Sequence, residues 1–305
     1  MRKTDLQKFF IRDDVTVVVT DSGLGGMSVV ADLAERMKTA GLFRRVRIIF
    51  FNASFDNRSG YNKLDSEAAK LAIFDSALDR MTAMYHPDLI IIACNTLSVL
   101  YPKTLHYRHA NVPVVGIVEI GVDLILGNLP ANGTCNVVLF ATPTTISSNV
   151  HKQMLASSGV SQKNIIGIAC PDLADYIEED FRGEGTQNAV AQFVDEAITA
   201  LDPAKPVMVS LNCTHYGFIA STFREKFELR GIEPLAILDP NPGMTDLILS
   251  QSPGNRFEAS DVSVDVICKV NIFPEVMASI GHLVSQISPQ TAGALKRFRR
   301  DVHLF

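Results

Sequence analysis

Short runs of apolar, often β-branched residues alternate along this chain with segments that have the period of an α-helix. The apolar runs lack polar alternation, which is typical of parallel strands covered on both faces. In the first part of the chain they predict strands at residues 15–20, 46–51, 89–94 and 112–117. Helices are predicted between them at residues 27–40, with Gly41 as the stop signal, and at 67–85, before Pro87.

The same alternation begins again further along the chain. It predicts strands at residues 136–141, 164–168, 206–211 and 235–239, with helices at 144–156 and 186–201. Strands that alternate with helices in this way form parallel sheets with helices on both faces. We therefore predict an α/β protein made of two similar units. The first unit comprises residues 1–117 and 233–305, where the chain packs back onto it, and the second comprises residues 118–232.

The composition is that of an ordinary globular chain of 305 residues, with 47% hydrophobic and 20% charged residues. A net charge of -5 and the lack of a basic stripe argue against a nucleic-acid partner. The N-terminus has no apolar stretch typical of a signal peptide. The most apolar long segment, residues 112–130, carries Glu119, Asp123 and two prolines, so it is a poor membrane span. We expect a soluble cytoplasmic protein without a membrane partner.

The five cysteines are odd in number, scattered, and free of any C-x-x-C spacing. This pattern argues against a disulfide framework and against a structural zinc site. Reduced thiols in a cytoplasm fit better, and the histidines show no metal-ligand spacing either. We predict no metal. The cysteines are Cys94, Cys135, Cys170, Cys213 and Cys268.

Three polar clusters follow predicted strands: TDSGLGG (20–26), CNT (94–96) and CTH (213–215). Ligands of open α/β sheets bind beyond the carboxyl ends of the strands, so we expect the three clusters to form one site. The glycine-rich turn fits neither the P-loop nor the dinucleotide-binding fingerprint. Its N–H groups, at a helix N-terminus, could hold a substrate carboxylate. It could equally be a plain tight turn in which Asp21 caps the helix.

Two of these clusters contain a cysteine, Cys94 and Cys213, followed by hydrogen-bonding side chains. Such donors can stabilise a thiolate. If the two sulfurs faced each other across a cleft, a thiolate could remove a proton from carbon while a thiol returned one from the opposite side. That would invert a stereocentre without a cofactor. The spacing alone also allows two inert buried cysteines.

Several motifs then identify a resemblance that covers most of the chain. The chain resembles the aspartate/glutamate racemase family, most of all its glutamate racemases. The resemblance implies two pseudo-symmetric α/β domains with the active site in the cleft between them, and a two-cysteine mechanism without a cofactor. It also implies a homodimer and a role in supplying D-glutamate for cell-wall synthesis. The matching pieces are TDSGLGGMSV (20–29), ACNTLS (93–98), GIVE (116–119), ATPTTISSNVHKQ (141–153), ACPDLADYIEE (169–179) and NCTHYGF (212–218).

Carried over residue by residue, the resemblance implies that Cys94 and Cys213 are the two acid–base residues. Asp21 and His215 would assist proton transfer on their respective sides. Glu178 would be the acidic residue near His215, although Glu179 is adjacent and a position on a helix surface is an alternative. The side chains implied to hold the carboxylate and amino groups of an acidic amino acid are Ser22, Asn95, Thr96 and Thr214.

The match breaks after the second strand and again beside Cys213. Glutamate racemases carry a motif close to G-D-T-x-x-x-P-Y-G where this chain has FNASFDNRSGYNKL (51–64). Either Ser59 and Gly60, or Gly60, Tyr61 and Asn62 after a short insertion, are expected to take over substrate binding there. Arg58 is either a carboxylate partner or a surface arginine. The family's L-G-C-T-H-Y-P becomes LNCTHYGF, with Gly217 in place of the proline.

These departures leave the substrate open. The alternatives to glutamate are aspartate or another acid, and a protein that binds an acidic metabolite without catalysis. A thiol redox protein is a weaker alternative, because it needs Cys94 and Cys213 within disulfide reach.

Overall fold

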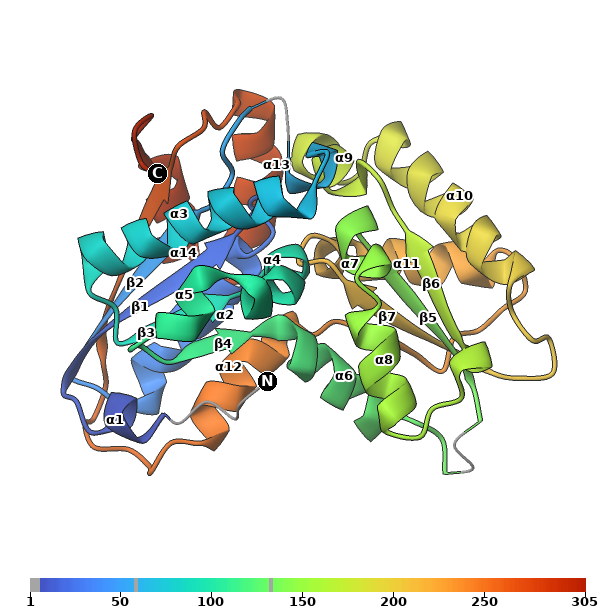
Figure 1. Ribbon diagram of the computed structural model, residues 1–305, viewed down its shortest axis with the longest axis horizontal. Coiled ribbons are helices and arrows are strands. Elements are labelled where there is room, and N and C mark those ends of the chain that lie inside the picture. The colour runs from blue at the N-terminus through green and yellow to red at the C-terminus, as the bar shows by residue number, and fades with distance from the viewer. Residues whose placement is uncertain (1–5, 58–59, 132–133) are drawn as a thin grey trace.

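The protein contains two parallel sheets with helices on both faces, placed side by side (Figure 1). The computed structural model describes residues 6–57, 60–131 and 134–305. The first sheet has six strands in the order β10-β9-β2-β1-β3-β4, and the second has four in the order β6-β5-β7-β8. The predicted α/β class with two parallel-sheet units is confirmed. We call each sheet with its helices a domain.

The strands β1 to β8 agree closely with the eight predicted apolar runs, whereas β9 and β10 lie outside those runs. The first sheet contains β1 (Asp14–Asp21), β2 (Arg45–Asn52), β3 (Leu89–Ile92), β4 (Val114–Gly116), β9 (Asp261–Cys268) and β10 (Arg299–Arg300). The second sheet contains β5 (Asn136–Ala141), β6 (Ile165–Ala169), β7 (Val207–Asn212) and β8 (Ala236–Leu238).

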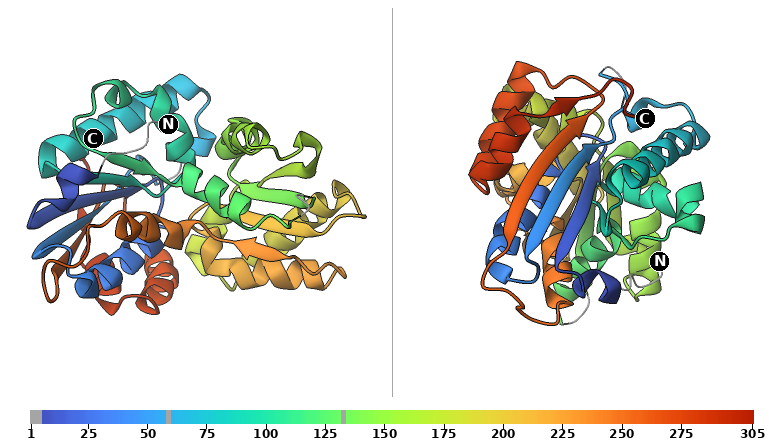
Figure 2. Two further views of the ribbon diagram at one scale, coloured as in Figure 1. Left: turned by 90° about the horizontal axis from the view of Figure 1, so that it is seen from below. Right: turned by 90° about the vertical axis from the view of Figure 1, so that its left-hand side faces the viewer.

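The helices lie on both faces of each sheet, and α6 runs between the two domains (Figure 2). Those of the first domain are α1 (Gln7–Phe10), α2 (Met27–Ala40), α3 (Glu67–Tyr85), α4 (Asn95–Leu100), α5 (Leu105–His109), α12 (Asn241–Ser250), α13 (Pro274–Ser285) and α14 (Pro289–Lys296). The others are α6 (Ile117–Gly127), α7 (Pro143–Ser147), α8 (Val150–Ser157), α9 (Leu173–Asp180), α10 (Glu184–Thr199) and α11 (Ala220–Glu228). None of the helices in the described ranges is long and apolar enough to cross a membrane.

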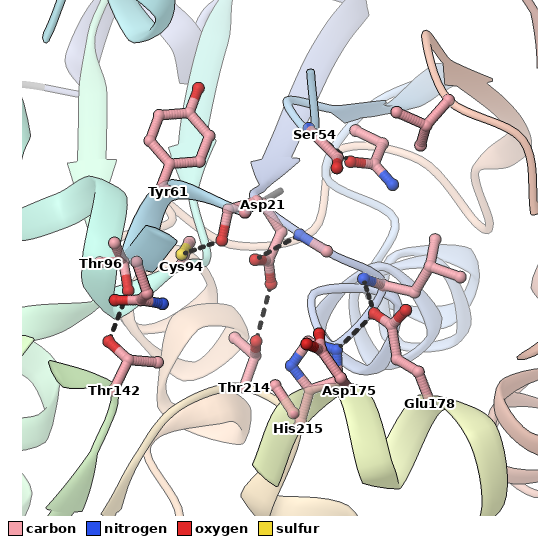
Figure 3. Close-up of a pocket in the computed structure, with 18 of the residues that line it drawn as sticks. Asp21, Ser54, Tyr61, Cys94, Thr96, Thr142, Asp175, Glu178, Thr214 and His215 are labelled. Atoms are coloured by element: carbon pink, nitrogen blue, oxygen red, sulfur yellow. Dashed lines mark hydrogen bonds and ion pairs between the residues drawn. The ribbon is translucent and has the colours of Figure 1, made fainter. Parts of the chain in front are cut away.

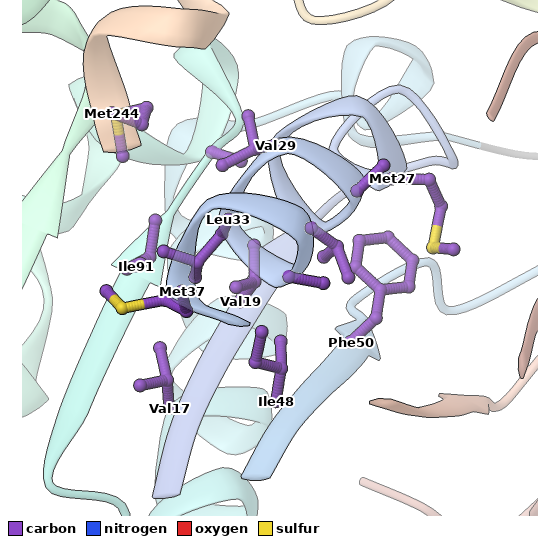
Figure 4. Close-up of a cluster of buried hydrophobic side chains, with 14 of the residues drawn as sticks. Val17, Val19, Met27, Val29, Leu33, Met37, Ile48, Phe50, Ile91 and Met244 are labelled. Atoms are coloured by element: carbon purple, nitrogen blue, oxygen red, sulfur yellow. The ribbon is translucent and has the colours of Figure 1, made fainter. Parts of the chain in front are cut away.

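Alternate residues of β1 enter different cores on the two faces of the first sheet. Val17 and Val19 of β1 pack against Leu33 and Met37 of α2 (Figure 4). Val18, between them, belongs to the core on the other face, together with α3. A strand buried on both faces needs apolar residues at every position, which is why the sequence shows continuous runs.

Two features differ from the sequence-based expectation. β8 pairs with β7, so the second sheet extends beyond the expected boundary at residue 232; the chain rejoins the first sheet at β9, beside β2. The expected helix at 144–156 is two helices, α7 and α8, separated at Asn149, whose φ of 57° is left-handed. Hydrophobic periodicity locates elements, but it carries no information about which sheet a strand joins.

Candidate active site

A cavity of about 380 Å³ lies where the carboxyl ends of β1, β3 and β7 meet, and residues of both domains line it. It brings together every predicted site residue that the structure describes. Ser59 lies outside the described residues, as does Arg58. The predicted residues that line the cavity are Asp21, Ser22, Gly60, Cys94, Asn95, Thr96, Glu178, Cys213, Thr214 and His215.

On the side of the first domain, Cys94 follows β3 and precedes α4, and only 5% of it is exposed. Its sulfur lies 3.2 Å from the Ser22 hydroxyl. Burial raises the pKa of the Cys94 thiol well above its usual range, and the nearby Asp21 carboxylate raises it further. Burial also raises the pKa of Asp21 itself, against the lowering effects of His215 and of the hydrogen bond from Thr214. This half of the site favours a protonated thiol.

On the other side, Cys213 follows β7, and its sulfur lies 3.6 Å from Nδ1 of His215. Nε2 of His215 lies 2.7 Å from Oε1 of Glu178 on α9 (Figure 3). Burial lowers the pKa of His215, but the hydrogen bonds to Cys213 and Glu178 outweigh burial and hold that pKa well above its ordinary value. This half of the site favours a charged imidazolium beside the sulfur.

Hydrogen bonds join the halves across the cavity. The Thr214 hydroxyl donates to Oδ2 of Asp21 at 2.7 Å (Figure 3), and the main-chain N–H of Leu24 donates to Oε1 of Glu178 at 2.7 Å. This approach requires Gly25, because a Cβ there would overlap the Thr214 hydroxyl and lie 2.7 Å from the main-chain nitrogen of His215. The glycine-rich turn therefore lets the two domains come together.

The expectation that this turn offers free N–H groups to a substrate is wrong for two of its residues. The N–H of Leu24 binds Glu178, and the N–H of Gly23 donates to Oδ1 of Asp21 at 3.3 Å. Carboxylates of the protein occupy these donors. The sequence could not reveal this, because Glu178 lies 154 residues away from Leu24.

Asn95 and Thr96 present polar groups of a different kind. Only 2% of Asn95 is exposed, and neither its amide nitrogen nor its amide oxygen has a hydrogen-bond partner among the described residues. Buried polar atoms without partners cost free energy unless a ligand satisfies them. The Thr96 hydroxyl lies 2.8 Å from the Thr142 hydroxyl of the second domain (Figure 3). Thr142, which also lines the cavity, belongs to the matched ATPTTISSNVHKQ segment but was not singled out as a site residue.

Residues 24–240 match the sequence model of the Asp/Glu/hydantoin racemases. The chain belongs to this racemase family. A glutamate racemase of Granulibacter bethesdensis is 30% identical over 240 residues, which cover 79% of this chain and 76% of the relative. One of Aliarcobacter butzleri is 27% identical over 210 residues, covering 68% of this chain and 74% of the relative. The predicted family and enzyme class, a racemase and hence an isomerase, are confirmed.

Solved structures confirm the two-domain racemase fold. Glutamate racemase of Francisella tularensis, in complex with D-glutamate, superposes with a TM-score of 0.68 at 20% identity and covers 90% of this chain and 95% of its own. Glutamate racemase of Escherichia coli, in complex with L-glutamate and the activator UDP-MurNAc-Ala, has a TM-score of 0.61 at 20% identity. It covers 90% of this chain and 96% of its own.

The segment that departs from the family pattern lines the cavity of this racemase together with the chain after β9. Ser54, Gly60 and Tyr61 contribute from residues 51–64, and Val270–Val276 supplies further lining residues. The side chain of Asn57 ties the two segments together, donating to the carbonyl of Asn271 at 2.8 Å and accepting from its N–H at 3.2 Å. No sequence signal marked the C-terminal segment as part of the site, since its contacts with residues 51–64 are formed only in the fold.

Within the described ranges, no group of three or more His, Cys, Asp or Glu side chains is placed to hold a metal ion. All five cysteines are free thiols, and all are buried. Among the titratable groups that line the cavity are the two thiols, the Asp21 carboxylate and the His215–Glu178 pair.

Proposed function

We propose that this racemase interconverts L- and D-glutamate by a two-base mechanism that uses Cys94 and Cys213 and no cofactor. One observation carries the proposal: the two thiols line a single cavity in opposite electrostatic surroundings. Racemisation needs one base and one acid on opposite faces of Cα, and unequal surroundings supply both at neutral pH.

In one direction, the thiolate of Cys213, beside the imidazolium of His215, removes the proton from Cα. The C–H bonding electrons remain on the substrate as a carbanion that is delocalised into its carboxylate. The Cys94 thiol then donates its proton to the opposite face of Cα, which leaves the inverted amino acid, a Cys213 thiol and a Cys94 thiolate. The reverse direction exchanges these roles, and solvent restores the starting protonation. Donors aimed at the substrate carboxylate stabilise the developing charge.

The polar lining suits an amino-acid substrate. We assign Ser22, Asn95, Thr96 and Thr214 to its carboxylate and amino groups; the unpartnered amide of Asn95 supports this assignment most directly. Gly60, which lines the cavity, is assigned to substrate binding, and so is Ser59, which lies outside the described residues. Two solved relatives carry glutamate according to their descriptions, which supports glutamate as the substrate.

The same proposal places the enzyme in the cytoplasm as a homodimer that supplies D-glutamate for peptidoglycan synthesis. The glutamate racemases among its relatives support this role.

Aspartate is the second candidate substrate, because residues 51–64 lack the family's G-D-T and P-Y-G elements and still line the cavity. A protein that binds an acidic metabolite without catalysis would share the same cavity, but it would not need two thiols in contrasting surroundings.

The test is proton NMR of L-glutamate and L-aspartate incubated with the enzyme in D₂O, combined with chiral analysis of the products. Loss of the Cα proton signal with inversion of glutamate is the expected result. Exchange of the Cα proton of aspartate alone would show that aspartate, and not glutamate, undergoes this chemistry. Tight binding of either acid without Cα exchange would contradict the catalytic proposal.

A further inference from the structure

The turn that carries Cys213 is held in place by a residue that belongs to none of the motifs shared with the family. Asn241 begins α12, where the chain has just left β8, and only 4% of it is exposed. Its side-chain nitrogen donates to the main-chain carbonyl of Thr214 at 2.9 Å. Thr214 is the residue next to Cys213, and its hydroxyl donates to Asp21. The amide of Asn241 therefore holds the peptide unit that joins both halves of the site.

Asn241 is itself fixed by its neighbours. Its main-chain N–H donates to Oδ1 of Asp239 at 3.0 Å. The Asp239 carboxylate fits there because residue 217 is glycine: a Cβ at Gly217 would overlap Oδ2 of Asp239 and lie 3.0 Å from the side-chain nitrogen of Asn241. The family motif has a proline at this position, and a proline carries a Cβ. The lack of a side chain at Gly217 therefore makes room for Asp239 and Asn241 in this chain.

We propose that Asn241 is a positioning residue for racemisation, which fixes the main chain of Thr214 and thereby aims the Cys213 sulfur at Cα. This proposal rests on the two-cysteine function above. Asn241 lines no part of the cavity and acts only through Thr214. Its loss disturbs the Cys213 half of the site and leaves the hydrogen bond between Ser22 and Cys94 in place.

The test compares Asn241→Ala and Asn241→Asp with the wild type. The aspartate variant keeps the size of the side chain and removes the donor. Displacing a reacting group by a fraction of an ångström lowers kcat, and we expect a loss of roughly ten- to a hundredfold with little change in KM. The matched control is Asn128→Ala, because Asn128 donates in the same way to the carbonyl of Leu124 at 2.8 Å on an exposed stretch of α6. It should leave kcat unchanged.

A purely structural role would not change the deuterium isotope effect on kcat/KM, measured with Cα-deuterated substrate from each enantiomer separately. If the Cys213 half is impaired, proton removal by Cys213 becomes more rate-limiting and the isotope effect rises for one enantiomer. It falls for the other enantiomer, whose proton Cys94 removes. Equal isotope effects in wild type and variants, with kcat within about twofold of wild type, would overturn the proposal.

A second test needs no substrate. It measures the rates at which iodoacetamide alkylates the two thiols, separately for the Cys94 and Cys213 peptides. Asn241→Ala should change the alkylation rate of Cys213 and leave that of Cys94 as it is; an unchanged rate for Cys213 would overturn the proposal. This measurement separates the two proposals, because it stands even if the wild type fails to exchange the Cα proton of any acid tested.

Discussion

The two cysteine-bearing halves of the cavity share a backbone design and differ in charge. In each, a buried strand of a parallel sheet ends just before a cysteine, and small polar residues follow. Around Cys94, burial and the Asp21 carboxylate disfavour a thiolate, and they outweigh the opposite effect of the Ser22 hydroxyl. Next to Cys213 stands His215, whose pKa is held high by its hydrogen bonds to Cys213 and Glu178.

In the proposed mechanism, this difference in surroundings separates an acid from a base without any change of residue type. A pseudo-symmetric fold can therefore present a proton donor on one side of a substrate and a proton acceptor on the other. Each turnover exchanges the two states.

Replacement of each thiol in turn is the strongest test of the roles proposed for the two halves. Cys94→Ser and Cys213→Ser should each lower racemisation by roughly 10³-fold or more, because a serine hydroxyl is a far poorer acid–base group at neutral pH. Chiral chromatography of glutamate would measure the loss. Cys135→Ser, at a buried cysteine outside the cavity, is the control. Substantial turnover by either active-site variant would refute the two-base mechanism.

Asp21→Asn tests the electrostatics of the Cys94 half. Removal of the carboxylate should lower the pKa of the Cys94 thiol, since Asp21 raises it, and should slow racemisation by about 10²-fold. The pH dependence of Cys94 alkylation measures the first effect. Asp123→Asn, at an exposed position on α6, serves as the control. An unchanged pH dependence of Cys94 alkylation would show that Asp21 does not raise the pKa of the Cys94 thiol.

Glu178→Gln tests the Cys213 half. The carboxylate helps to raise the pKa of His215, so the variant should lower that pKa and move the alkaline limb of the kcat/KM profile to lower pH. We expect a loss of about tenfold near neutral pH.

The same change has a signature in stability. A raised histidine pKa stabilises the folded state fully below the unfolded value near 6.5, and this contribution disappears as pH rises through the folded value. In the variant, Tm should begin to fall at a lower pH than in the wild type. Glu196→Gln, at an exposed position of α10 outside the cavity, should change neither profile.

Gly25→Ala tests the contact that brings the halves together. The added methyl group would overlap the Thr214 hydroxyl, so we expect a loss of about 1–3 kcal/mol in the free energy of unfolding, with a smaller effect on rate than the changes above. Urea titration measures it. Gly127→Ala has nothing within 4 Å of the new methyl group and should be neutral or slightly stabilising. Equal stability of both variants would show that the domains can separate at this point without loss.

Much of the fold could be predicted from local pattern. The strand at residues 136–141 and the helices at 27–40 and 67–85 have the expected bounds, because periodicity and stop signals act within a few residues. The split of the 144–156 helix at Asn149 escaped prediction, because the apolar period continues through a residue whose left-handed backbone breaks the helix. The candidate site was found because three clusters follow strand ends, and its residues do line one cavity.

By itself, the sequence determined eight strands and the longer helices of the first half of the chain, the family, and the residue types at the strand ends. Only the tertiary structure decided which sheet β8 joins, that Glu178 occupies the N–H of Leu24, and that Asn241 supports Thr214. It also decided the surroundings of the two thiols, since Asp21 comes near Cys94, and Glu178 near His215, only in the fold. The physical reason is the distance over which each effect acts. Hydrophobic period and backbone preference depend on a few neighbours in the sequence. Burial and electrostatics depend on the groups that the fold brings within a few ångströms, however far apart they are in the chain.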